Sequence, residues 1–88
     1  MSDKIYRFTA AWCQPCKMLA KYLEDAKLDA PVEVVDIDVH QEFAQENLIR
    51  SIPTLIYMRD GKEVARSVGM KNTSEIEKWA AEAASATV

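Results

Sequence analysis

The sequence predicts a single α/β domain in which a four-stranded mixed sheet carries helices on both faces. Runs rich in β-branched and aromatic residues alternate with amphipathic helical segments in the order β-α-β-α-β-β-α. The 88-residue chain is too short for two independent cores. A composition of 49% hydrophobic and 28% charged residues is typical of a folded protein. We therefore expect residues 1–88 to form one domain.

The first half of the chain predicts two parallel strands joined by a helix. Lys4 to Thr9 alternates as a short strand does, and a helix is expected from about Pro15. Residues 27–31 end this helix, and Val32 to Val39 is a β-branched, strand-like run. The crossover between the two strands should be right-handed. The expected core face of the helix consists of residues at helical spacing, namely Met18, Leu19, Tyr22, Leu23 and Ala26.

The second half predicts a short helix, a hairpin and a final helix. The short helix is expected over about His40 to Leu48. Thr54 to Met58 and Glu63 to Val68 are expected strands, and Asp60-Gly61 between them is a strong hairpin signal. The hairpin strands should pair in antiparallel fashion within the same sheet.

The last helix is expected to begin near Thr73. Asn72 is placed to serve as its N-cap, and Glu75 three residues later completes a capping box. The residues of its expected core face are Ile76, Trp79, Ala80 and Ala83.

Charge and hydropathy exclude several classes of function. A net charge of −3 without a basic stripe argues against binding to nucleic acid. No apolar run is long enough to cross a bilayer. The first residues lack the positive start and long apolar core of a signal peptide. We therefore expect a cytoplasmic protein with no membrane partner, in a compartment that keeps a thiol pair reduced.

Both cysteines lie in the segment Trp12-Cys13-Gln14-Pro15-Cys16, directly after the first strand and at the start of the first helix. Backbone N–H groups at a helix N-terminus stabilise negative charge, so a Cys13 thiolate is favoured there. Two intervening residues let Cys16 approach Cys13 within disulfide geometry. The pair can therefore capture a substrate as a mixed disulfide and release it by internal exchange. Pro15 suits a first helical turn, where no N–H is needed.

Three other roles for a cysteine pair fit the sequence less well. A structural zinc site needs four ligands, and His40 is the only histidine. A disulfide staple across so short a loop removes little entropy from the unfolded chain. Inert buried cysteines rarely occur as a pair at a helix start. The pair at a strand-to-helix junction of a β-α-β unit therefore indicates redox chemistry and no bound metal.

These motifs resemble those of the thioredoxin family. Trp12-Cys13-Gln14-Pro15-Cys16-Lys17 is similar to the family signature Trp-Cys-Gly-Pro-Cys-Lys, and Ser51-Ile52-Pro53-Thr54 is similar to its cis-proline loop. Asp60-Gly61 and Val68-Gly69 fall where the family has its hairpin turn and a substrate-facing glycine. The resemblance runs from about Tyr6 to Ala83 and implies a thioredoxin-like fold.

The resemblance also implies an activity and its partners. Cys13 would be the nucleophile and Cys16 the resolving thiol of a protein-disulfide reductase with no bound cofactor. NADPH-dependent thioredoxin reductase, a flavoprotein, would return the disulfide to the dithiol, and the chain would act as a monomer. A cis Pro53 would expose the backbone of Ile52 to pair with an extended substrate. The expected substrate-contacting residues are Trp12, Gln14, Pro15, Ile52, Pro53, Val68, Gly69 and Met70.

The chain departs from the family pattern ahead of the first strand and between the cysteines. A strand and helix that the family usually carries at its amino terminus are missing before Lys4. The run from Val32 should therefore be an edge strand, where Asp36 and Asp38 on one face discourage edge pairing. Gln14 replaces the glycine of the signature.

A third departure concerns charge behind the second cysteine. Arg7 aligns with a buried aspartate of the family, and Val34 aligns with the lysine that partners it. We expect a buried Arg7 to pair with Asp36 on the neighbouring strand, because an unpaired buried cation is costly. Arg7 and Lys17 are then candidate electrostatic modulators of the thiols.

Two other functions remain open at this stage. A glutaredoxin-like reductase would draw electrons from glutathione; the short amino terminus favours it, whereas Pro15 directly before Cys16 favours a thioredoxin. A protein-interaction subunit would use the same surface for docking without redox chemistry.

Overall fold

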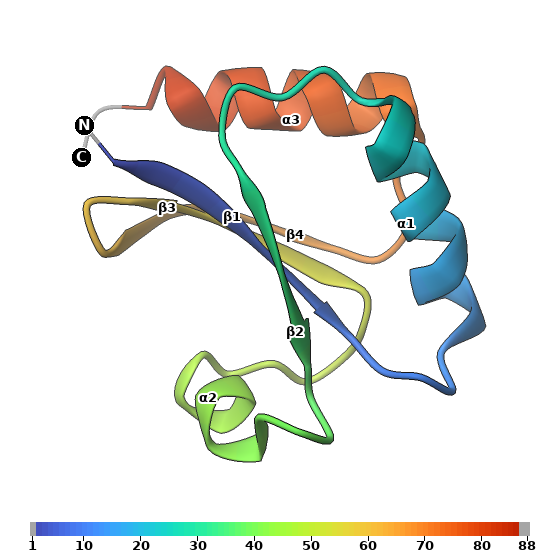
Figure 1. The fold of residues 1–88 in the computed structure, drawn as a ribbon. Coiled ribbons are helices and arrows are strands. Elements are labelled where there is room, and N and C mark those ends of the chain that lie inside the picture. Colours follow the sequence, from blue (N-terminus) through green and yellow to red (C-terminus); the bar gives the residue numbers. More distant parts are fainter. Residues whose placement is uncertain (1, 87–88) are drawn as a thin grey trace.

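The computed structural model describes residues 2–86, and its elements follow the expected order (Figure 1). The strands are β1 (Asp3–Thr9), β2 (Val32–Asp36), β3 (Thr54–Arg59) and β4 (Lys62–Val68), arranged β2-β1-β3-β4 in one sheet. The helices are α1 (Gln14–Asp25), α2 (Gln41–Glu46) and α3 (Thr73–Ala84). Helices α1 and α3 lie on one face of the sheet and α2 on the other (Figure 1). This confirms the predicted α/β fold class.

Strand β1 lies inside the sheet, parallel to β2 and antiparallel to β3. Alternate side chains of a strand point to opposite faces, so β1 contributes to both cores. Ile5 is fully buried beneath α1 and α3, where it joins Leu19 and Ile76. Phe8 is fully buried on the α2 face, where it packs with Ile56. The two layers of helices are thus held on a common strand.

The local signals at the turn and at the last helix are confirmed. Asp60 and Gly61 have φ values of 51° and 82°, as a tight two-residue hairpin turn between β3 and β4 requires. Asn72 Oδ1 accepts the N–H of Glu75, whose carboxylate accepts the N–H of Asn72, both at 2.9 Å.

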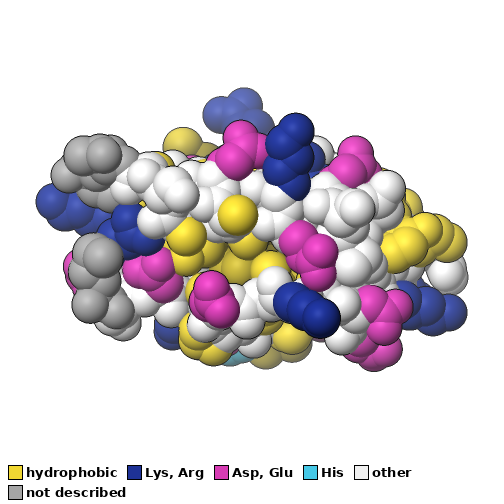
Figure 2. Space-filling view, turned by 90° about the horizontal axis from the view of Figure 1, so that it is seen from above, with side chains coloured by type: hydrophobic (Ala, Val, Ile, Leu, Met, Phe, Trp, Pro, Cys, Tyr) yellow, Lys and Arg dark blue, Asp and Glu magenta, His cyan; other side chains and the backbone are white. Residues whose placement is uncertain are grey.

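Figure 2 shows acidic and basic side chains mixed around a hydrophobic centre on the face above α3, so this face has no patch of a single sign.

The second strand is shorter than predicted, because β2 ends at Asp36 and not at Val39. Asp36 Oδ1 accepts the N–H of Asp38 at 2.8 Å, and this side chain–backbone bond turns the chain out of the strand. The expectation that Asp36 and Asp38 share one strand face is therefore wrong. The strand itself lies at the edge of the sheet, as predicted.

Two further sequence expectations fail on the helices. Met18 is 53% exposed, since the buried face of α1 is centred on Cys16 and Leu19, and Met18 falls to the side of it. The second helix was expected over His40 to Leu48, but α2 is confined to Gln41–Glu46. It ends early because Leu48 adopts a left-handed backbone with φ 55°.

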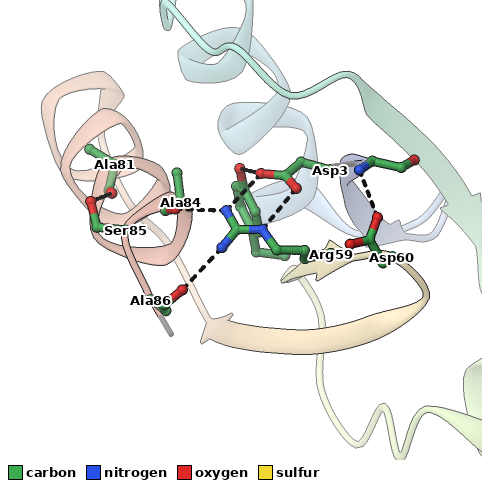
Figure 3. Close-up of polar contacts among 9 residues, drawn as sticks. Asp3, Arg59, Asp60, Ala81, Ala84, Ser85 and Ala86 are labelled. Carbon is green, nitrogen blue, oxygen red and sulfur yellow. Dashed lines mark hydrogen bonds and ion pairs between the residues drawn. The ribbon is translucent and has the colours of Figure 1, made fainter. Parts of the chain in front are cut away.

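At the end of the sheet where β1 begins, hydrogen bonds from Arg59 join β1, β3 and the end of α3 (Figure 3). Arg59 donates to both carboxylate oxygens of Asp3, through Nε at 3.0 Å and Nη2 at 2.9 Å. The same guanidinium donates to the carbonyls of Ala84 at 2.6 Å and Ala86 at 3.0 Å. The hydrogen bonds from Arg59 and then from Tyr57 lower the pKa of Asp3 from its ordinary 3.8 to about 2.

We predict that Asp3→Asn lowers the free energy of unfolding at neutral pH. Because the folded-state pKa of Asp3 lies below its unfolded value, its contribution is present above the unfolded pKa of about 4 and is lost as the pH falls toward about 2. The difference between wild type and variant should therefore shrink across this range in urea unfolding. Asp29→Asn, at an exposed carboxylate without a hydrogen bond among residues 2–86, should show no such difference. An equal loss for Asp3→Asn at every pH would contradict this assignment.

Candidate active site

The cysteine pair lies at the junction between the end of β1 and the start of α1. Cys13 is the N-cap of α1, and its Sγ accepts the N–H of Cys16 at 3.2 Å. The N–H of Cys13 donates to the carbonyl of Ala10 at 3.1 Å, which sets the approach of the chain to the helix. Pro15 lies in the first turn, as the sequence predicts. One of the N–H groups that the first turn of the helix leaves free, that of Cys16, therefore points at Cys13 Sγ.

Cys13 and Cys16 form a disulfide with their Cα atoms 5.3 Å apart. Cys16 is fully buried, whereas Cys13 keeps 4% of its surface exposed. Ala10, Ile37 and Ile52 pack around the pair. An incoming group can therefore reach this site only from the side of Cys13.

The loop from Ser51 to Thr54 lies against the cysteines, and the bond between Ile52 and Pro53 is cis, as the resemblance implied. Its backbone is held on both sides of Ile52: Thr54 Oγ1 donates to the Ser51 carbonyl at 2.7 Å, and the Gly69 N–H donates to the Pro53 carbonyl at 2.9 Å. Within residues 2–86 the Ile52 backbone makes no hydrogen bond. Its N–H and C=O are thus available to an extended ligand.

An exposed rim surrounds this loop and the disulfide. Trp12 is 66% exposed, and Gln14 and Pro15 are exposed beside it. Val68 pairs with Thr54 in the sheet, which brings it next to the cis-proline loop. The exposed residues on either side of Gly69 are Val68 and Met70. The structure thus gathers the predicted rim residues at one end of the sheet.

A pocket of about 260 Å³ opens between Trp12 and the cis-proline loop. Sequence reasoning missed half of its lining, because the contributing segments are far apart in the chain. The residues that line the pocket are Trp12, Ile37, Ile49, Arg50, Ser51 and Ile52. This lining is largely apolar, with one cationic side chain at Arg50.

Trp12 is held by a partner that the sequence did not indicate. Its indole Nε1 donates to Asp38 Oδ2 at 2.9 Å, across 26 positions of the chain. The turn begun by Asp36 presents the Asp38 carboxylate to the indole. The orientation of the largest rim side chain therefore depends on the turn after β2.

The expected pairing of Arg7 with Asp36 does not form. The register places Val34 opposite Arg7 and Asp36 opposite Thr9, and Asp36 is engaged in its own turn. Arg7 is partly buried and makes no ion pair within residues 2–86. Burial lowers the pKa of its guanidinium from the ordinary value. Lys17 projects from the exposed side of α1.

Residues 2–86 contain neither a metal-binding cluster nor a membrane-spanning helix. No cluster of three or more His, Cys, Asp or Glu side chains could hold a metal ion there. None of the helices in this part of the chain has the length and hydropathy needed to span a bilayer.

Comparison with known proteins places this geometry in a family. A family model described as thioredoxin matches residues 2–82. Thioredoxin from Chlamydia trachomatis is 46% identical over 72 residues, which is 78% of this chain and 71% of that protein. Thioredoxin from Bacillus subtilis is 46% identical over 68 residues, which is 73% of this chain and 65% of that protein. The solved structure of a mutant thioredoxin from Halobacterium salinarum superposes with a TM-score of 0.87 at 28% identity, covering 99% of this chain and 79% of that one.

We predict that Asp38→Ala frees the Trp12 indole. With its acceptor gone, the indole N–H should exchange with solvent faster and its NMR resonance should shift. Unfolding stability should change by less than about 1 kcal/mol, because the bond is exposed. Val39→Ala, an exposed change in the same turn, serves as the matched control. An unchanged indole resonance in Asp38→Ala would show that the hydrogen bond does not form in solution.

Proposed function

Because this chain belongs to the thioredoxin family and is a thiol–disulfide oxidoreductase, we propose that its Cys13–Cys16 pair reduces disulfides of other proteins and is recharged by thioredoxin reductase. The reductase, a flavoprotein, would supply electrons from NADPH. The observation that carries the proposal is the disulfide at the N-terminus of α1, beside a cis-proline loop with an unpaired backbone at Ile52. We further propose that the protein acts as a monomer without another cofactor, in the cytoplasm.

The chemistry follows from the positions of the two sulfurs. In the dithiol form, the Cys13 thiolate attacks one sulfur of a substrate disulfide, whose S–S bond breaks as a mixed disulfide forms. Cys16 loses its proton and attacks Cys13 Sγ, which releases the second substrate sulfur. Two electrons and two protons have then passed to the substrate, and the Cys13–Cys16 disulfide is restored. The hydrogen bond from the Cys16 N–H at 3.2 Å favours negative charge on Cys13 in the first step.

The rim supplies binding to an extended substrate. The unpaired N–H and C=O of Ile52 would pair with the substrate backbone, as in strand addition. Trp12, Gln14 and Pro15 would contact the substrate on one side of Cys13. On the other side the contacts would come from the cis-proline loop at Pro53 and from Val68, Gly69 and Met70.

Two cations are candidates for tuning the thiolate. Arg7 is partly buried and without an ion-pair partner in residues 2–86, so its charge is less screened than that of a surface residue. Lys17 directly follows Cys16 on α1 but is exposed. We therefore expect Arg7 to have the larger effect.

Reduction of insulin disulfides tests the function and its electron donor. The oxidised protein should catalyse insulin reduction with NADPH and thioredoxin reductase, and should do so poorly with glutathione and glutathione reductase. The reverse result would identify a glutathione-dependent reductase. Retention of the biological role by a Cys13→Ser, Cys16→Ser double variant would identify a docking protein.

We predict distinct behaviour for the two single cysteine variants. Cys16→Ser should accumulate a mixed disulfide with substrate, because the resolving thiol is absent, whereas Cys13→Ser should form none. In the reduced wild type, iodoacetamide should label Cys13 first, with a half-maximal rate below the pH of about 8.5 typical of free cysteine. Mass spectrometry of the labelled and trapped species checks both results.

The contribution of Arg7 is read in the same experiment. Arg7→Met should move the pH of half-maximal labelling upward by about half a unit to one unit. Arg7 lies on the same face of β1 as Ile5, which packs against Leu19 of α1, and a cation on that face favours the thiolate. Lys17→Met should move it less. Equal labelling of both cysteines would contradict the assigned roles, and an identical pH profile in Arg7→Met would remove Arg7 as a modulator.

A further inference from the structure

Arg66 on β4 binds the segment that leads into the cis-proline loop. Its Nη2 donates to the carbonyl of Asn47 at 2.8 Å, and its Nη1 donates to that of Leu48 at 3.4 Å. Glu63 accepts from Nε at 2.9 Å and from Nη2 at 2.8 Å, and so orients the guanidinium. The hydrogen bonds within this pair raise the pKa of Arg66 and lower that of Glu63. Both groups therefore stay charged at neutral pH.

The two carbonyls that Arg66 binds belong to Asn47 and Leu48, where the backbone enters a left-handed conformation that is unfavourable for a non-glycine residue. Leu48 has φ 55°, a conformation that a non-glycine residue adopts only when its surroundings hold it. The Leu48 side chain is 66% exposed, so packing contributes little to holding it. Inside the turn, the N–H groups of Leu48 and Ile49 donate to the carbonyls of Gln45 and Ala44, both at 3.0 Å. Arg66 supplies the bonds on the outer side.

The segment after Leu48 reaches the active site within a few residues. Ile49 to Ile52 line the pocket beside Trp12, and Ile52 packs against the cysteines. The far end of this segment is anchored by Thr54 Oγ1 on the Ser51 carbonyl and by the Gly69 N–H on the Pro53 carbonyl. Its near end is joined to the sheet by Arg66. Residues 49–52 are thus hydrogen-bonded into the structure at both ends, through Arg66 on one side and through Thr54 and Gly69 on the other.

We infer that Arg66 is a positioning residue for substrate binding. Its hydrogen bonds to the carbonyls of Asn47 and Leu48 set the path of residues 49–52. This path determines the shape of the pocket and the position of the Ile52 backbone groups that pair with substrate. This inference rests on the proposed reduction of protein disulfides. Only arginine suits the position, because its planar fork serves two carbonyls and a carboxylate at once, and lysine presents a single ammonium. Arg66 contacts neither cysteine, so it acts on binding and not on the thiolate.

The test compares a large and a small disulfide. Pre-reduced Arg66→Met, which keeps side-chain length and loses every donor, is mixed with insulin in excess, so that no reductase is involved. The half-saturating insulin concentration should rise about five- to tenfold, while the limiting rate changes little. The reaction with the small disulfide dithiobis-nitrobenzoate, which needs no pocket, should stay within about twofold of wild type. Lys62→Met is the matched control. It removes an exposed cation from the same strand, and the Lys62 ammonium makes no hydrogen bond within residues 2–86.

Amide hydrogen exchange provides a second readout. The Ile49 N–H, bonded to the Ala44 carbonyl, should exchange faster in Arg66→Met, whereas the amides of α1 should be unchanged. Arg66→Lys should give smaller changes in the same direction. So should Glu63→Gln, because the Arg66 guanidinium is then less well oriented. These two variants carry the test if Arg66→Met does not fold.

Three results would overturn the inference. Equal loss toward insulin and the small disulfide would show a general structural role. Unchanged insulin binding in a folded Arg66→Met or Arg66→Lys would show that these hydrogen bonds do not position the loop. A wild type that reacts with the small disulfide and fails to reduce insulin would overturn the proposed function together with this inference.

Discussion

Hydrogen bonding of β1 to a strand on each side holds the parts of the site together at one end of the sheet. β1 ends at Thr9, and the chain reaches Cys13 four residues later. The antiparallel register pairs Phe8 with Thr54, so β3 begins where β1 ends, and Pro53 arrives beside the cysteines. Residues that are 40 positions apart in sequence therefore meet through a single strand pairing, which the burial of Phe8 on one face helps to hold in register.

At that end of the sheet, apolar packing and directed N–H groups act on the sulfurs in opposite senses. Ala10, Ile37 and Ile52 keep water from the pair, and exclusion of water disfavours charge on a thiol. The start of α1 offsets this at Cys13 alone, since the sulfur of Cys13 accepts an N–H while Cys16 lies fully buried one turn inside. The fold therefore favours a thiolate on one cysteine and protects the other, as the proposed roles of attacking and resolving thiol require.

Two arginines of the sheet make similar contacts with helices on opposite faces of the sheet (Figure 1). Arg59 joins Asp3 to the carbonyls that end α3, and Arg66 joins Glu63 to the carbonyls that end α2. Neither helix has a basic residue in its own last turn. A cation near a helix C-terminus interacts favourably with its unpaired carbonyls, and here the strands supply that cation. The charge that completes each helix thereby also ties the helix to the sheet.

The sequence by itself determined the features that depend on neighbouring residues: the order of elements, the tight turn at Asp60-Gly61, the capping box at Asn72, and the cysteine pair at a helix start. Each of these involves groups within a few positions, where propensity and spacing decide. Only the tertiary structure decided that Asp38 holds Trp12 and that Arg66 holds Asn47. It also decided that Arg7 lacks the predicted carboxylate, because strand register faces it with Val34. Such contacts depend on how distant segments align in three dimensions, and no local pattern encodes that alignment.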